Sequence, residues 1–140
     1  MALLFRCDVC GFELFEPIAV LRVSTLGLYD DSRYPGRCLL ALHRHEEDFA
    51  EMPRDLAVEL LDDARAAARA IKAAVDADRI NYAVLGNAEP HVHLHLIPRK
   101  WETDVVPGKA PWAHPQKASP LAPEQKSRIV AEIARLLNGA

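Results

Sequence analysis

The most regular pattern in this chain of 140 residues is an alternation of histidine and apolar side chains between positions 91 and 96. In an extended strand, successive side chains point to opposite faces, so His91, His93 and His95 would share one face and the apolar residues the other. A helix would scatter the three imidazoles around its circumference. The alternation therefore predicts a strand, and we expect it to end at Pro98 because proline cannot donate to a sheet ladder.

Apolar residues at three- and four-residue steps predict a long helix from Pro53 to about Ala77. Pro53 suits the first turn of a helix. A second helix is expected to begin near Pro120 or Pro123 and to end at Asn138-Gly139. Five charged residues of the long helix lie mostly away from its apolar face and indicate a solvated surface. They are Asp62, Asp63, Arg65, Arg69 and Lys72.

Four further segments read as strands, with Ser24 and Thr25 as a turn between the first two. They are residues 18–23, 26–29, 38–42 and 79–85. Residues 46–51 read as a short helix, and the proline-rich segment 100–120 as irregular structure. We therefore predict an α+β fold, a five-stranded antiparallel sheet with a long central helix and a C-terminal helix largely on one face. The apolar side of the histidine strand would pack on the helices and leave the histidine side open to substrate.

Composition narrows the function classes. Half of the residues are hydrophobic, the formal net charge is −3 and the sequence pI is about 6.1, so neither nucleic acid nor an anionic membrane is an expected partner. The apolar start is interrupted by Arg6, which predicts neither a signal peptide nor a membrane span. Three cysteines without a secretion signal predict reduced thiols and a cytoplasmic protein.

Three imidazoles on one strand face allow three interpretations. They could form a polar surface in water, or a metal site, because histidines spaced two apart on a strand are common metal ligands. A catalytic metal usually needs nearby acidic ligands, and the nearest acids, Glu89 and Glu102, lie outside the strand. The third interpretation is nucleophilic catalysis by one imidazole, with the others binding anionic oxygens.

Cys7-Asp8-Val9-Cys10 forms a short CxxC motif, which also allows three interpretations. It could be half of a zinc site, a redox pair or two small core residues. Because no second CxxC exists, any zinc would take histidines as its remaining ligands.

The segment His91-Val92-His93-Leu94-His95-Leu96-Ile97 resembles the signature of the histidine triad (HIT) family, His-φ-His-φ-His-φ-φ with φ apolar, without a departure. Residues 85–90 and Pro98-Arg99 are similar to the bacterial branch of that family. The resemblance implies a single HIT-like domain over residues 1–140, and a homodimer whose sheets join. It also implies a hydrolase or transferase acting on the α-phosphate of a purine nucleotide conjugate, such as a dinucleoside polyphosphate or a nucleoside phosphoramidate, through a nucleotidyl-histidine intermediate.

By the same resemblance, His93 would attack the phosphorus while His95 stabilises the phosphate oxygens. His91 would either donate into the same site or bind zinc. An acidic residue before the loop at 30–36 would bind the ribose; Asp31 is the match and Asp30 the alternative. The family often has a histidine after the glycine of this loop, where this chain has Arg37. The substrate-binding residues implied are Asn87, Asp31, Asn81, Arg37 and Trp112.

The resemblance further implies a structural zinc bound by Cys7, Cys10, His45 and His91, with His43 as an alternative to His45. No organic cofactor is implied. Two other functions stay open: a catalytically silent nucleotide-binding or regulatory protein, and a metal-dependent hydrolase that uses the triad itself as ligands.

Overall fold

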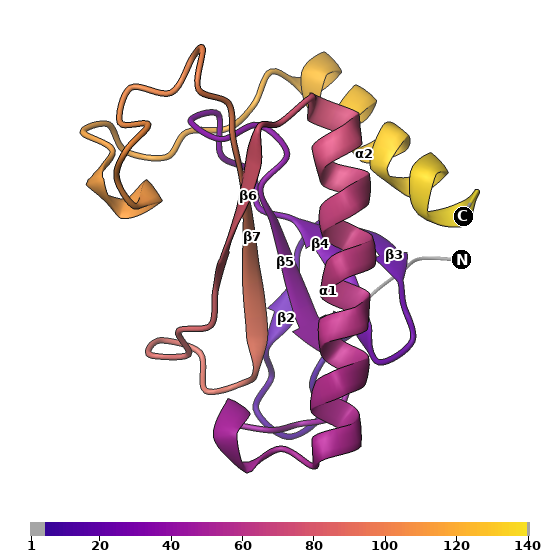
Figure 1. Ribbon diagram of the computed structural model, residues 1–140. Coiled ribbons are helices and arrows are strands. Elements are labelled where there is room, and N and C mark those ends of the chain that lie inside the picture. The colour runs from indigo at the N-terminus through magenta and orange to yellow at the C-terminus, as the bar shows by residue number, and fades with distance from the viewer. Residues whose placement is uncertain (1–4, 140) are drawn as a thin grey trace.

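The computed structural model describes residues 5–139 and contains one five-stranded antiparallel sheet in the order β3-β4-β5-β7-β6, with a separate two-stranded β1-β2 ribbon (Figure 1). The predicted α+β fold with a long central helix and a C-terminal helix is confirmed. The strands are β1 Phe5–Arg6, β2 Glu13–Leu14, β3 Pro17–Val20, β4 Ser24–Leu28, β5 Cys38–Leu42, β6 Arg79–Ala83 and β7 His93–Arg99. The helices are α1 Arg54–Val75 and α2 Pro123–Asn138, with single 3-10 turns at η1 Phe49–Glu51 and η2 Pro111–Ala113.

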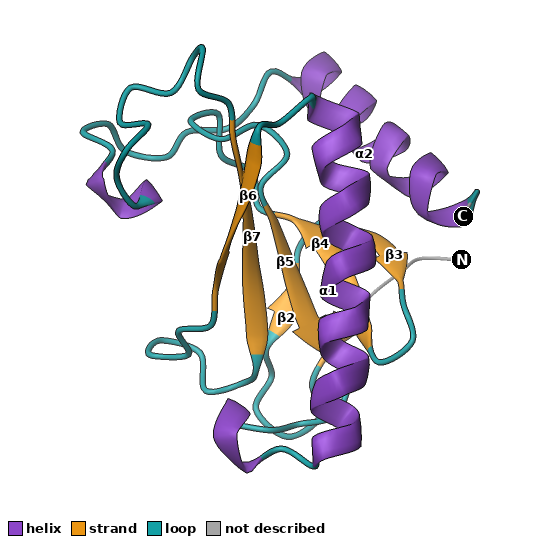
Figure 2. Cartoon of the chain, in the orientation of Figure 1, coloured by secondary structure: helices purple, strands orange, loops and turns teal. Residues whose placement is uncertain are grey.

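Both long helices lie on the same side of the five-stranded sheet (Figure 2). The apolar stripe of α1 is buried, with Leu60 and Ile71 fully covered and alanines at 64 and 67 between them. Small alanine side chains let the helix approach the sheet closely. Strands β4, β5 and β7 turn alternate side chains toward the helices, among them Leu26, Leu40 and Leu94. This packing forms the main core, as the periodicities predicted.

The turn between the first two strands of the sheet lies before the residues predicted to form it. Ser24 and Thr25 belong to β4, and the chain reverses at residues 21–23. The cause is Asp63, which is buried on α1 and accepts hydrogen bonds from the backbone N–H groups of Arg22 and Val23 and from the Ser24 hydroxyl. The prediction that Asp63 lies on a solvated surface is therefore wrong.

Strand β7 extends further than expected at its C-terminal end. Its ladder with β5 stops at Leu96, whereas its ladder with β6 continues through Pro98 to Arg99. The expectation that Pro98 ends the strand holds only on the β5 side. His91 lies two residues before β7 begins, and its backbone is bent rather than extended.

The histidine face of the sheet is not open along its whole length, contrary to the prediction. Cys7, Phe12 and Leu14 of the N-terminal ribbon pack against Leu39 and Ala41 on that face. A second, smaller core therefore covers the first part of the histidine strand. The segment 46–51 forms only the single 3-10 turn η1, and none of the helices in residues 5–139 is long and apolar enough to cross a membrane.

Candidate active site and metal centre

His93 is held in one tautomer by the backbone. Its Nδ1 lies 2.6 Å from the carbonyl oxygen of His91, and a carbonyl only accepts, so Nδ1 carries the proton. The Nε2 nitrogen is then left with a free lone pair. The ring is buried and stacks on Phe12 at a centroid distance of 4.9 Å.

His95 is half-buried and its Nδ1 accepts a hydrogen bond of 3.2 Å from the Arg37 guanidinium. Trp112 meets its ring edge-on at 5.9 Å, and Tyr29 lies 6.3 Å away. Burial lowers the pKa of His95 to about 4, with Arg37 and His93 adding to the effect. His95 is therefore neutral at physiological pH. Two of the residues named from the sequence, Arg37 and Trp112, thus contact the third histidine of the triad.

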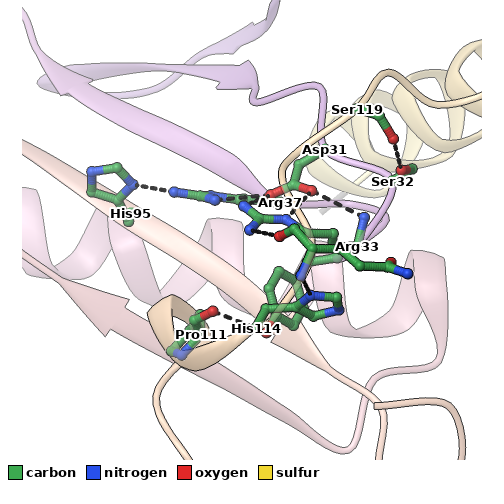
Figure 3. Close-up of polar contacts among 10 residues, drawn as sticks. Asp31, Ser32, Arg33, Arg37, His95, Pro111, His114 and Ser119 are labelled. Carbon is green, nitrogen blue, oxygen red and sulfur yellow. Dashed lines mark hydrogen bonds and ion pairs between the residues drawn. The ribbon is translucent and has the colours of Figure 1, made fainter. Parts of the chain in front are cut away.

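Asp31 lies behind this contact and is fully buried. Its carboxylate accepts hydrogen bonds from the Arg33 guanidinium and backbone N–H, and from Arg37 at 2.9 Å (Figure 3). Burial acts to raise its pKa, but these hydrogen bonds outweigh it and the pKa falls, so Asp31 stays ionised. The alternative ribose residue, Asp30, accepts from the Leu121 backbone N–H and faces a cavity.

A cavity of about 620 Å³ lies next to side chains that contact the two histidines, although neither histidine lines it. Phe12 and Tyr29, which contact His93 and His95 respectively, form part of its wall, and Leu39 lies directly across the ladder from His95. The remaining lining mixes apolar and aromatic side chains with four carboxylates, of which Asp30 is one. It comprises Gly11, Glu13, Leu14, Phe15, Glu16, Leu28, Glu89, Ala118, Ser119 and Pro120.

The two asparagines named from the sequence differ in position. Asn81 accepts a hydrogen bond from Arg99 on the far part of β7 and so lies away from the His93 ring. Asn87 is exposed in the loop that leads into the triad. Residues 84–86 of that loop line a hollow of about 130 Å³ beside His93. Asn87 itself does not line this hollow, so only its place in the sequence, four residues before His91, links it to the triad.

Cys7, Cys10, His45 and His91 come together in the structure, with one ligand atom of each within 4.8 Å of all the others. The Sγ–Nδ1 distances of the pairs Cys7–His45 and Cys10–His91 are both 3.5 Å. Zinc bound tetrahedrally by sulfur and nitrogen separates such ligands by about 3.5 Å, given bond lengths of about 2.3 and 2.05 Å. The donor set and its spacing therefore fit zinc.

The hydrogen bonds around this cluster favour metal binding as well. His91 is fully buried and its Nε2 donates to the Leu42 carbonyl at 2.7 Å, which leaves Nδ1 free toward Cys10. His45 Nε2 contacts Glu47 at 3.5 Å in the same way. Such outer contacts orient metal-binding imidazoles in proteins. His43 instead pairs with the Thr25 hydroxyl, so His45 is the histidine that joins the cluster.

Comparison with known proteins identifies the family to which this fold belongs. The family model of the HIT domain matches residues 23–102, which is more than half of the chain. The chain therefore belongs to the HIT domain family, whose members bind nucleotides and include hydrolases. No curated protein matches this chain in sequence.

Solved structures repeat the fold. A histidine triad protein from Sinorhizobium meliloti is 28% identical, with a TM-score of 0.74 and coverage of 84% of this chain and 86% of that one. A zinc-bound histidine triad family protein from Mycobacterium smegmatis is 19% identical, with a TM-score of 0.60 and coverage of 89% and 87%. The diadenosine triphosphate hydrolase of Plasmodium falciparum is 16% identical, with a TM-score of 0.65 and coverage of 99% and 87%. The last two show similarity of fold alone.

Three residues at this site were not found from the sequence: Phe12, Tyr29 and Arg33. Phe12 lies two residues after Cys10. The expected zinc site joins Cys10 to His91, and this could have indicated that Phe12 packs against the triad. No sequence pattern indicated the roles of Tyr29 and Arg33. Tyr29 contacts His95, which is distant in the sequence, and Arg33 binds Asp31 within an irregular loop.

Proposed function

We propose that this protein is a nucleotidyl hydrolase or transferase in which His93 attacks the α-phosphorus of a nucleotide conjugate. The observation that carries the proposal is the 2.6 Å hydrogen bond from His93 Nδ1 to the His91 carbonyl, which leaves Nε2 free for attack. In this step a bond forms between Nε2 and phosphorus, and the bond from phosphorus to the leaving group breaks. Water or another acceptor then displaces His93, so that one difficult displacement becomes two easier ones.

The cavity lined by Phe12 and Tyr29, which contact the two histidines, supports a nucleotide as substrate. Its aromatic and apolar wall suits a purine base, and the Asp30 carboxylate can accept hydrogen bonds from ribose hydroxyls. His95 and Asn87 would donate to the phosphate oxygens as negative charge develops on them. Losing one well-aimed donor raises the barrier of such a step by about 3 kcal/mol.

The cysteine and histidine cluster is proposed to hold a structural zinc ion. Four protein ligands close the coordination shell and leave no position for a substrate water. The ion would tie the N-terminal ribbon to the segments that carry His45 and His91. Cysteine ligands must stay reduced, which suits the predicted cytoplasmic location. A catalytic metal held by the triad itself is not supported, because His91 turns toward the cysteines and His95 has no free lone pair: Arg37 donates to its Nδ1, so the neutral ring carries its proton on Nε2.

The edge strand β6 is the proposed dimer contact. Tyr82 is 57% exposed on this strand, and Val84 and Leu85 follow it with similar exposure. The neighbouring surface of α1 carries acids in its first half and arginines and lysine in its second, so a two-fold axis across the helix would pair opposite charges. These residues are Asp55, Asp62, Arg65, Arg69 and Lys72. Joining the β6 edges of two copies would also cover an otherwise unpaired strand.

The test of the proposed activity is a His93→Ala variant assayed with diadenosine polyphosphates and adenosine phosphoramidates. Turnover should fall by at least about 10⁴-fold, as the loss of a catalytic nucleophile does elsewhere, while the circular dichroism spectrum stays unchanged. His43→Gln is the matched control, because His43 is exposed and belongs to neither the cavity nor the cluster. Turnover that persists in His93→Ala would remove the nucleophile assignment.

The catalytically silent alternative predicts a different result. A silent protein would bind the nucleotide at micromolar concentration, form no adduct on quenching, and turn over none of these substrates in the unsubstituted protein. Recovery of an acid-labile nucleotidyl adduct on His93 would exclude it.

A further inference from the structure

The Arg37 side chain is buried and is held on several sides by its neighbours. The side chain is 4% exposed, and its guanidinium stacks on Tyr29 with a distance of 3.8 Å from Cζ to the ring centroid. One terminal nitrogen donates to Asp31 at 2.9 Å and the other to His95 Nδ1 at 3.2 Å. Figure 3 shows Arg37 lying between these two partners. The side chain therefore links a buried carboxylate to the third histidine of the triad.

The chemistry of this contact fixes where the His95 proton sits. A guanidinium carries only donors, so it can pair with Nδ1 only when Nδ1 has no proton. Neutral His95 must then carry its proton on Nε2. A proton on Nδ1 would place two donors against each other at hydrogen-bond distance.

Arg37 itself has little freedom to turn away. Asp31 is fully buried and holds both Arg33 and Arg37, and Tyr29 covers one face of the Arg37 guanidinium. Two guanidinium groups against one carboxylate leave a net charge of one positive unit next to His95. The other charged or titratable neighbours of the His95 ring are His93 on the same strand and Tyr29, and β6 places only Ala83 opposite it.

We propose that Arg37 is a positioning residue that holds His95 in the tautomer protonated at Nε2, so that this N–H is available to a phosphate oxygen. His93 and His95 would thus be given opposite tautomers by their surroundings. The His91 carbonyl leaves His93 with a bare Nε2, while Arg37 leaves His95 with a protonated one. The catalytic meaning of the second tautomer rests on the proposed function, but the tautomer itself is a property of the free protein.

The direct test is long-range ¹H–¹⁵N NMR of the histidine rings in the free protein, with His95 assigned from the signals lost in His95→Gln. His95 should show a protonated Nε2 and an unprotonated Nδ1. In Arg37→Met both tautomers should be populated and the pKa of His95 should rise, because one of the groups that lower it has been removed. Arg33→Met is the matched control, since Arg33 binds the same Asp31 carboxylate without touching His95; its His95 tautomer should match that of the unsubstituted protein.

A protonated Nδ1 on His95 in the unsubstituted protein would overturn the proposal even if Arg37→Met failed to fold. An unaltered tautomer and titration of His95 in folded Arg37→Met would overturn it as well.

Kinetics then separate this proposal from the proposed function. In Arg37→Met, kcat should fall about 10²-fold or more with a smaller change in KM. Arg37→Lys, which keeps a charge and a donor, should recover part of kcat. If His95 shows the expected tautomer but the protein turns over no nucleotide conjugate, the role of Arg37 is supported and the proposed function is rejected. If Arg37→Met is fully active, the proposed function is supported and the catalytic role of Arg37 is rejected.

Discussion

Replacement of Arg99 by methionine should be among the most destabilising single changes in this protein. Arg99 is 2% exposed, and its guanidinium donates to Asp104 at 2.6 Å and to Asn81 at 2.8 Å. It also donates to the backbone carbonyls of Val106 and Lys109, both at 2.8 Å. Methionine fills much of the same space but supplies none of these donors. One buried carboxylate and two carbonyls of an irregular segment would lose their partner.

The size of the effect follows from these losses. Breaking a buried ion pair by removing one partner costs about 3–5 kcal/mol, and an unsatisfied buried carbonyl adds to that. Part of the cost is recovered when the segment 104–109 opens to water, so we expect a loss of about 3–5 kcal/mol in the free energy of unfolding. For a domain of 140 residues this lowers Tm by about 10–15 °C.

Urea unfolding followed by circular dichroism measures this quantity directly. Arg79→Met is the matched control, because Arg79 lies opposite Arg99 in the β6–β7 ladder but is exposed. Its change should stay within about 0.5 kcal/mol, as surface substitutions usually do. The reasoning would be refuted if Arg99→Met lost less than about 1 kcal/mol, or if the two variants lost equal amounts.

Two further predictions concern the metal and the oligomer. His45→Ala should lower the zinc content measured by atomic emission and lower Tm, whereas His43→Ala should leave the zinc content unchanged; zinc at full occupancy in His45→Ala would rule out the proposed ligand set. Tyr82→Asp on β6 should convert a dimer to a monomer in sedimentation velocity, whereas Val20→Asp on the opposite edge strand β3 should not; the reverse result would move the interface to the other edge.

The elements with a strong local periodicity could be predicted from the sequence. The spacing of leucine, alanine and isoleucine gave α1 to within two residues at each end, and the continuous apolar run at 38–42 gave β5 with its exact bounds. Each pattern depends only on which residues of a single helix or strand face the core, so it can be recognised without knowing the rest of the fold. The alternation at 91–96 likewise placed His93 and His95 on the same strand.

Features that depend on distant partners could not be predicted. Asp63 looked like part of a charged helix surface, since nothing nearby shows that the turn at 21–23 brings backbone N–H groups to it. Asp31 was expected to bind ribose, but Arg33 and Arg37 enclose its carboxylate once the loop folds. Asp63 is thus paired by donors that only the tertiary structure brings near, whereas the donors to Asp31 lie within six residues of it and are oriented by the fold of an irregular loop.

The geometry also explains how the three histidines can differ although the motif repeats them evenly. The His91 ring points to the cysteines and the Leu42 carbonyl, and it does not line the larger cavity. His95 stays neutral, because burial and Arg37 lower its pKa to about 4. The positive charge beside the triad therefore comes from Arg37, the residue that replaces a histidine often found in the family. An arginine keeps this charge at every physiological pH, whereas a histidine there would lose it above its pKa.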